Sequence, residues 1–345
     1  SLCVGGIALA WCFTPPTLSS PKIHHTLMLK GWQVRPYVHP ATIEALRHPA
    51  ESKRIAQFYT SHTVQKKRVA TYTHPPVFLV FPEEGAFVSP LYSSHPLEVS
   101  GNEASHGAVE QVSTQDKTFA TWTHSLHDEK QAPVQAIMSG AYGVSMTDSL
   151  QTSTWQHYNS VVMLHKNTLQ WSTKKYLVPF GETWIGMPRP MWVQWGNRLL
   201  ALVRLLGVPL PEKLSCDTLF PLSFTSRRRL EIPTFTLPYP YPNKHPHEPL
   251  KLQALVCFEL LHPQAFKTLW EQSALQKTTA LHAEKTDALV NVSNLGWFHQ
   301  QPKMHGQFLK HTYWLAYSLS QPIIMSNNDG FSGIITPNEK GFQSP

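Results

Sequence analysis

The sequence predicts a layered α/β fold, and two patterns along the chain predict it. Several continuous apolar runs have the length of a single strand, as expected for strands buried on both faces of a sheet. Between these runs, apolar residues recur every three to four positions, which is the spacing of a helix with one buried face. Because such strands and helices alternate over the 345 residues, we expect sheets covered by helices.

The first half of the chain contains four expected core strands and two expected helices, one of them between loops in the polar residues 91–130. Residues 25–34 and Val77–Phe81 are apolar enough for buried strands, and residues 41–70 between them have helical spacing. Residues 133–142 and 158–165 are two further apolar segments, separated by a loop rich in Ser and Thr.

The second half continues the alternation after a Pro-rich segment. Residues 209–250 contain many prolines, so we expect an extended loop there. The elements expected after this loop are a strand at 252–260, a helix at 263–277, a strand and turn at 288–298, a helix at 304–320, and two strands about a glycine turn at 323–335.

The composition indicates a folded protein with a positive surface. Hydrophobic residues make up 41% of the chain and charged residues 15%, which supports a sizeable core and argues against disorder. The net charge of +7 suits an anionic membrane surface. No nucleic-acid-binding motif appears, so nucleic acid is not an expected partner. The four cysteines have no CxxC spacing and are too few for a disulfide framework; they are Cys3, Cys12, Cys216 and Cys257.

Two apolar segments indicate contact with a membrane. Leu2–Phe13 is apolar apart from its glycines, and we interpret it as the end of a transmembrane helix, with a signal peptide or a buried helix as alternatives. The helical pattern at Trp192–Leu206 places Trp192 and Trp195 on an apolar stripe, with arginines on the other face. We expect this helix to lie on a membrane surface; packing on the core is the alternative.

Three apolar segments end in side chains that together could transfer an acyl group. FLVFPE ends at Glu83, KKYLVPFGE contains Lys174 and Glu182, and ALVCFE contains Cys257. A thiol can attack a carbonyl, a carboxylate can take the thiol proton, and an ammonium can stabilise the resulting oxyanion. Any one of these residues alone would more often be a core or surface residue.

These segments resemble the carbon–nitrogen hydrolase (nitrilase) superfamily. The LVPFGE form, the YNS at 158–160, the VSNLGWF at 292–298 and the QPIIMSNNDGFSGII at 321–335 are most similar to one branch, the bacterial apolipoprotein N-acyltransferases. The resemblance covers about residues 25–340 and implies a four-layer αββα sandwich. It divides the chain into residues 1–20, the end of a membrane helix and a linker, and residues 21–345, a catalytic domain whose 183–250 arm faces the membrane.

The resemblance also implies residue roles. Glu83 matches the general base, Lys174 the oxyanion-stabilising lysine and Cys257 the nucleophile. The supporting residues it implies are Glu182, Phe258 and Glu259, and the expected substrate-binding residues are Trp297, Trp192 and Trp195.

Several alternatives stay open at this point. Glu84 could replace its neighbour Glu83 as the base. The resemblance favours Lys174 over Lys175, because the family motif has its lysine eight positions before the second glutamate. Glu182 and Glu259 could be structural ion-pair partners, and Trp297 could be a core residue.

The activity implied by the resemblance is transfer of a fatty acyl chain from a phospholipid to the N-terminal amine of a lipoprotein, through a thioester. It implies a phospholipid donor, an apolipoprotein acceptor and a place in the bacterial inner membrane with the catalytic domain on the periplasmic side. No metal or organic cofactor is needed, and the lone His245-Pro246-His247 is typical of a surface loop. The alternatives are an amidase that uses water as the acceptor and a conjugal-transfer protein of the same superfamily.

Overall fold

The structure is a computed structural model in which the central strands and their covering helices are described. The residues described are 27–29, 32–36, 77–83, 91–93, 105–108, 112–113, 134–148, 153–166, 168–178, 182, 189–207, 224, 231–238, 249–278, 286–295, 302–328 and 330–337.

The larger sheet has nine strands in these ranges. Its main path runs in the order β1-β2-β3-β7-β8-β9-β5, with β4 and β6 joined beside β7. The strands are β1 (Leu27–Leu29), β2 (Trp32–Pro36), β3 (Val77–Val80), β4 (Leu91–Ser93), β5 (Ser105–Ala108), β6 (Val112–Ser113), β7 (Val134–Asp148), β8 (Ser153–His165) and β9 (Thr168–Thr173). The β2–β3 and β3–β7 pairs are parallel, and β7, β8 and β9 form an antiparallel meander.

The smaller sheet has five strands in the order β10-β11-β12-β13-β14. They are β10 (Thr234–Leu237), β11 (Leu250–Val256), β12 (Ala288–Ser293), β13 (Ile323–Asn327) and β14 (Gly333–Ile335). The three central strands are parallel and the two outer ones antiparallel to them. The described parts of the β11–β12 and β12–β13 connections contain α7 (Pro263–Thr278) and α8 (Pro302–Leu319), each of which begins at a proline, a residue favoured in the first turn of a helix.

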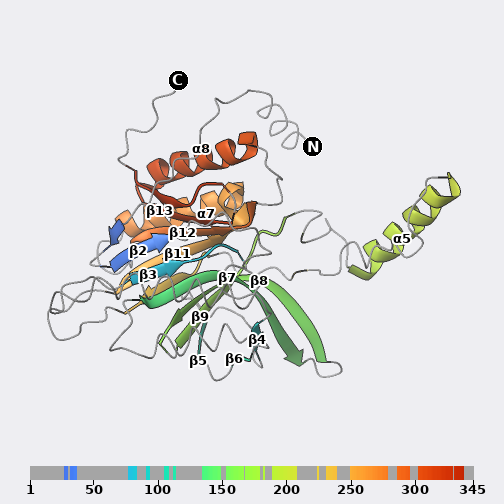
Figure 1. The fold of residues 1–345 in the computed structure, drawn as a ribbon, viewed down its shortest axis with the longest axis horizontal. Coiled ribbons are helices and arrows are strands. Elements are labelled where there is room, and N and C mark those ends of the chain that lie inside the picture. Colours follow the sequence, from blue (N-terminus) through green and yellow to red (C-terminus); the bar gives the residue numbers. More distant parts are fainter. Residues whose placement is uncertain are drawn as a thin grey trace, which may run out of the picture.

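The two sheets stack face to face, and α7 and α8 cover the outer face of the smaller sheet (Figure 1). Alternation along β11 shows why: Leu252, Ala254 and Val256 point into the core between the sheets, whereas Leu255 points to the helices. The larger sheet also contributes buried side chains to this core, among them Phe78, Met138 and Met163. This stacking brings the ends of β3 and β9 in the larger sheet close to the end of β11 in the smaller sheet.

The expected layered α/β class is confirmed, and several elements differ in their bounds. We expected one strand at residues 25–34, whereas the structure has two antiparallel strands there, β1 and β2. The Pro-rich 209–250 segment was expected to be a loop throughout, but Thr234–Leu237 pairs with β11 because Phe235 and Leu237 are fully buried there. The helix expected at 41–70 and the membrane segment at 1–20 lie outside the described residues.

The α5 helix (Arg189–Leu205) lies apart from the stacked sheets (Figure 1). This is the helix expected at Trp192–Leu206. Its apolar residues Trp195 and Leu199 are 62% and 61% exposed, so they are not packed into the core. Among the described residues, no helix is both long and apolar enough to cross a membrane.

Candidate active site

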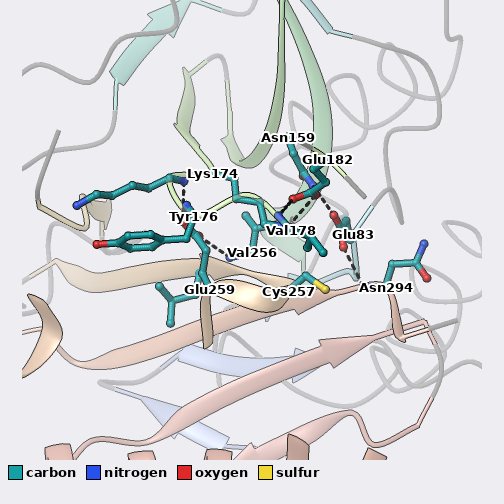
Figure 2. A network of polar contacts seen from close by, with 12 residues as sticks. Glu83, Asn159, Lys174, Tyr176, Val178, Glu182, Val256, Cys257, Glu259 and Asn294 are labelled. Atoms are coloured by element: carbon teal, nitrogen blue, oxygen red, sulfur yellow. Dashed lines mark hydrogen bonds and ion pairs between the residues drawn. The ribbon is translucent and has the colours of Figure 1, made fainter. Parts of the chain in front are cut away.

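Three strand ends from the two sheets meet at the candidate site (Figure 2). Glu83 lies three residues after β3, and Lys174 follows the last residue of β9. Both belong to the larger sheet, whereas Cys257 follows the last residue of β11 in the smaller sheet. The chemistry-bearing side chains are thus held by rigid strands whose relative positions are fixed by the shared core.

Cys257 occupies a sharp turn in the backbone. It is the first residue of the short helix η3 (Cys257–Leu261) and has a φ of 49°, a left-handed value that is uncommon outside glycine. The Asn291 amide donates to the Cys257 carbonyl oxygen at 3.4 Å. Such a conformation persists only where the surroundings impose it, and it turns the half-buried thiol out of the strand toward Glu83 and Asn294 (Figure 2).

Glu83 is held at both carboxylate oxygens. Its Oε1 accepts a hydrogen bond from the Asn159 side-chain amide at 2.5 Å. Its Oε2 accepts one from the backbone N–H of Asn294 at 3.0 Å. The same Asn294 N–H contacts the Cys257 thiol, so one backbone group touches both the candidate base and the candidate nucleophile. This fixes the rotation of the carboxylate beside the thiol.

Lys174 is buried, 1% exposed, and bound to the second glutamate. Its Nζ lies 2.8 Å from Glu182 Oε1, and that same oxygen accepts a hydrogen bond from Asn159 at 2.6 Å. Burial disfavours the charge on Lys174, but attraction to the Glu83 carboxylate, and to Cys257 once its thiol is ionised, opposes this effect. Together with Glu182 they raise the pKa of the ammonium from 10.5 to about 12, so Lys174 stays charged.

The thiol of Cys257 rests in its neutral form. Burial raises its pKa, and the neighbouring Glu83 carboxylate raises it further. Lys174 and the Asn294 N–H act in the opposite direction, but the resulting pKa is about 12 instead of 9.0. The proton must therefore leave as the sulfur attacks, which is the task of a base in contact with the site.

Glu259 has a structural role that differs from an ion pair. It is 3% exposed, and its carboxylate accepts hydrogen bonds from three backbone N–H groups. Those of Lys175 and Tyr176 bind Oε1 at 2.6 and 3.2 Å, and that of Val256 binds Oε2 at 2.9 Å. Glu259 therefore joins the backbone beside Lys174 to the backbone beside Cys257.

The remaining expected residues are placed as follows. Phe258 is half-buried and packs edge-on against the ring of His262. Lys175 lies with its Nζ 4.8 Å from the centre of the Tyr176 ring, in contrast to Lys174. Trp195 is on α5, away from the site. Glu84, Trp297 and the Trp192 side chain lie outside the described residues.

Sequence reasoning missed three asparagines that hold this site: Asn159, Asn291 and Asn294. Asn159 and Asn294 stand in motifs that carried the family resemblance, so their presence was noticed, but no residue pattern indicated their contacts. In the described residues, no cluster of three or more His, Cys, Asp or Glu side chains could hold a metal ion.

No protein-family model matches this sequence, and neither does any curated protein. Solved structures of an amidase of the nitrilase superfamily from Nesterenkonia AN1 are similar in fold. One variant has 11% identity, with 84% of this chain and 78% of that chain covered and a TM-score of 0.42. A second variant, with acrylamide added to its active-site cysteine, has 11% identity, coverage of 84% and 80%, and a TM-score of 0.42.

A further crystal structure of an amidase from Nesterenkonia sp. gives 12% identity, coverage of 84% and 78%, and a TM-score of 0.42. These amidases belong to the superfamily that the sequence motifs resemble. The likeness concerns the arrangement of sheets and helices.

Proposed function

We propose that this chain is an enzyme of the nitrilase superfamily that transfers acyl groups through a thioester on Cys257. The observation that supports this most strongly is the junction of the thiol, the Glu83 carboxylate and the Lys174 ammonium at the ends of strands from two sheets. The thiol is neutral and holds the proton that the base removes. The Glu83 carboxylate is fixed beside the thiol, and Lys174 is charged.

The first half-reaction forms the thioester. Cys257 attacks the carbonyl carbon of the donor while its proton passes to Glu83, and the carbonyl electrons move to oxygen. Lys174 stabilises this oxyanion. When the oxyanion collapses, the bond to the leaving group breaks, and Glu83 returns the proton to that leaving group.

The second half-reaction releases the acyl group to an acceptor. The acceptor attacks the thioester carbonyl and gives its proton to Glu83. The C–S bond then breaks, and the Cys257 sulfur recovers the proton. A water acceptor makes the enzyme an amidase or esterase, and an amine acceptor makes it an N-acyltransferase.

For the substrates, we propose a phospholipid acyl donor and the N-terminal amine of a lipoprotein as acceptor. Alongside the motif resemblance, α5 supports this choice, since its exposed Trp195, Leu199 and Leu202 form an apolar face with Arg198 and Arg204 exposed nearby. Lifting an acyl chain into water costs about 0.8 kcal/mol per CH₂, so an enzyme with lipid substrates gains from lying on the bilayer. The implied location is the bacterial inner membrane, on its periplasmic side.

The substrate proposal predicts different results with a lipid donor and with a soluble donor. Trp195→Ser combined with Leu199→Ser should reduce acyl transfer from phosphatidylethanolamine–phosphatidylglycerol vesicles to a diacylglyceryl-cysteine peptide by at least roughly tenfold, because two apolar side chains no longer enter the bilayer. Turnover of a soluble short-chain ester should be unchanged. Transfer is measured by mass spectrometry of the peptide.

Trp270→Ser is the matched control, because Trp270 is also exposed, at 50%, but lies on α7. It should leave both activities at the wild-type level. Equal losses with both donors in the α5 variant would contradict the membrane role of α5. Hydrolysis of small amides by a wild-type protein that ignores vesicles would favour the amidase alternative.

A further inference from the structure

Asn159 links three of the expected residues of the candidate site: Glu83, Lys174 and Glu182. Its side-chain Nδ2 donates one hydrogen to Glu83 Oε1 at 2.5 Å and the other to Glu182 Oε1 at 2.6 Å. Its backbone carbonyl accepts from the N–H of Lys174 at 2.7 Å. One residue of β8 therefore contacts both carboxylic acids and the backbone of the lysine (Figure 2).

The chemistry of an amide suits this place. A side-chain amide has two N–H donors and no charge, so it can hold two carboxylates together without changing the net charge of the site. Two carboxylates that lie close together repel each other and otherwise favour protonation of one of them. A base that already carries a proton cannot take the one from Cys257.

The strand fixes the direction of this amide. Val161 and Met163, two and four residues further along β8, belong to the core between the sheets, so Asn159 lies on the same face at the edge of that core. It is 7% exposed. A buried amide with both donors used leaves Glu83 little freedom to rotate away from the thiol.

Building on the proposed function, we propose that Asn159 is a positioning residue that keeps Glu83 ionised and aimed at Cys257, and keeps Lys174 in place through Glu182. Asn159 acts through Glu83, which takes the proton, and through Lys174, which stabilises the oxyanion. If the amide is exchanged for a carboxyl group, the rate of Cys257 acylation should therefore depend on whether that carboxyl group is protonated.

In the Asn159→Asp variant, the charged groups around the new carboxyl group determine whether its pKa is raised or lowered. Glu83 and Glu182 are in direct contact with it, and Lys174 and Cys257 belong to the same network. His157 lies on the same face of β8 and is hydrogen-bonded to Tyr142. With two carboxylates in contact, the pKa of an aspartic acid at 159 is raised. Below this pKa it is neutral and donates one hydrogen bond; above it, three negative charges meet.

The test compares Asn159→Asp and Asn159→Ala with the wild type in the rate of Cys257 acylation by a soluble short-chain ester, followed by intact mass between pH 5 and pH 9. Asn159→Ala should lose roughly 10²-fold in kcat with KM little changed, because the base is misplaced while the substrate still binds. Asn159→Asp should retain much of its rate near pH 5 and lose it as pH rises through about 5 to 8, where the wild-type rate does not fall.

Ser160→Ala is the matched control on the same strand. The Ser160 hydroxyl is buried with no hydrogen-bond partner in the described structure, and alternation places it on the opposite face from Asn159. This variant should acylate at the wild-type rate. If Asn159→Ala does not fold, Asn159→Asp at low pH still tests the inference, because its neutral carboxyl has the shape of the amide.

Wild-type acylation combined with a falling Asn159→Asp profile supports the inference. An Asn159→Asp profile parallel to that of the wild type, or an Asn159→Ala rate equal to it, overturns the positioning role and leaves the thioester mechanism intact. A wild-type protein that forms no adduct on Cys257 overturns the proposed function instead, and the role of Asn159 with it.

Discussion

Lys174→Met should fold but acylate roughly 10²–10³-fold more slowly than the wild type, because one donor to the oxyanion is worth about that much. The loss has a second cause. Lys174 lowers the pKa of the Cys257 thiol, so its removal leaves a thiol that is harder to ionise. The rate is measured in single turnover with a soluble ester.

Lys175→Met is the neighbouring control. The Lys175 Nζ lies over the half-buried Tyr176 ring, a cation–π contact that contributes about 1 kcal/mol. Its acylation rate should stay within about threefold of the wild type. Equal losses in rate for the Lys174→Met and Lys175→Met variants would contradict the assignment of Lys174 as the oxyanion-stabilising lysine.

Glu259→Ala should lower the free energy of unfolding by about 4.5 kcal/mol or more, because three backbone N–H groups lose an acceptor and each such hydrogen bond contributes about 1.5–3 kcal/mol. Those groups belong to Lys175, Tyr176 and Val256. Urea denaturation followed by circular dichroism measures the change. Glu259→Gln, which keeps one acceptor oxygen, should fall between the wild type and the alanine variant.

Glu271→Ala is the matched control for a glutamate outside the site. Its carboxylate lies 3.7 Å from the Lys267 Nζ, with the two side chains 63% and 66% exposed. Such a surface pair contributes little, so the change should be within about 0.5 kcal/mol. A Glu259→Ala variant as stable as Glu271→Ala would contradict the structural role of Glu259.

The sequence predicted the strands of the smaller sheet except β10, and the reason is their burial. The β12 and β13 strands are buried at every position, so their apolar runs are continuous. The β9 strand was missed because its residues, Thr168–Thr173, are largely polar, and their burial comes from packing that no local pattern shows. The helix α5 was predicted because its spacing is a local property.

In the candidate site, some residues could be predicted from the sequence and some contacts could not. Glu83, Lys174 and Cys257 could be chosen because they stand in short segments beside apolar runs, and these segments resemble the motifs of the nitrilase superfamily. The contacts of Asn159 could not, because they join residues 76 and 23 positions apart in the sequence. The role of Glu259 was also beyond the sequence, since backbone N–H groups 83 and 84 positions away are its partners. Long-range pairing of this kind depends on the register of two sheets.

The most direct test of the thioester mechanism is peptide mass spectrometry of the protein after a brief reaction with a short-chain phospholipid. The chain has four cysteines, so the position of the adduct matters. We expect one acyl group on Cys257, released by neutral hydroxylamine and absent from Cys257→Ala. An acyl group on any other residue, or an equal adduct on Cys257→Ala, would contradict the mechanism.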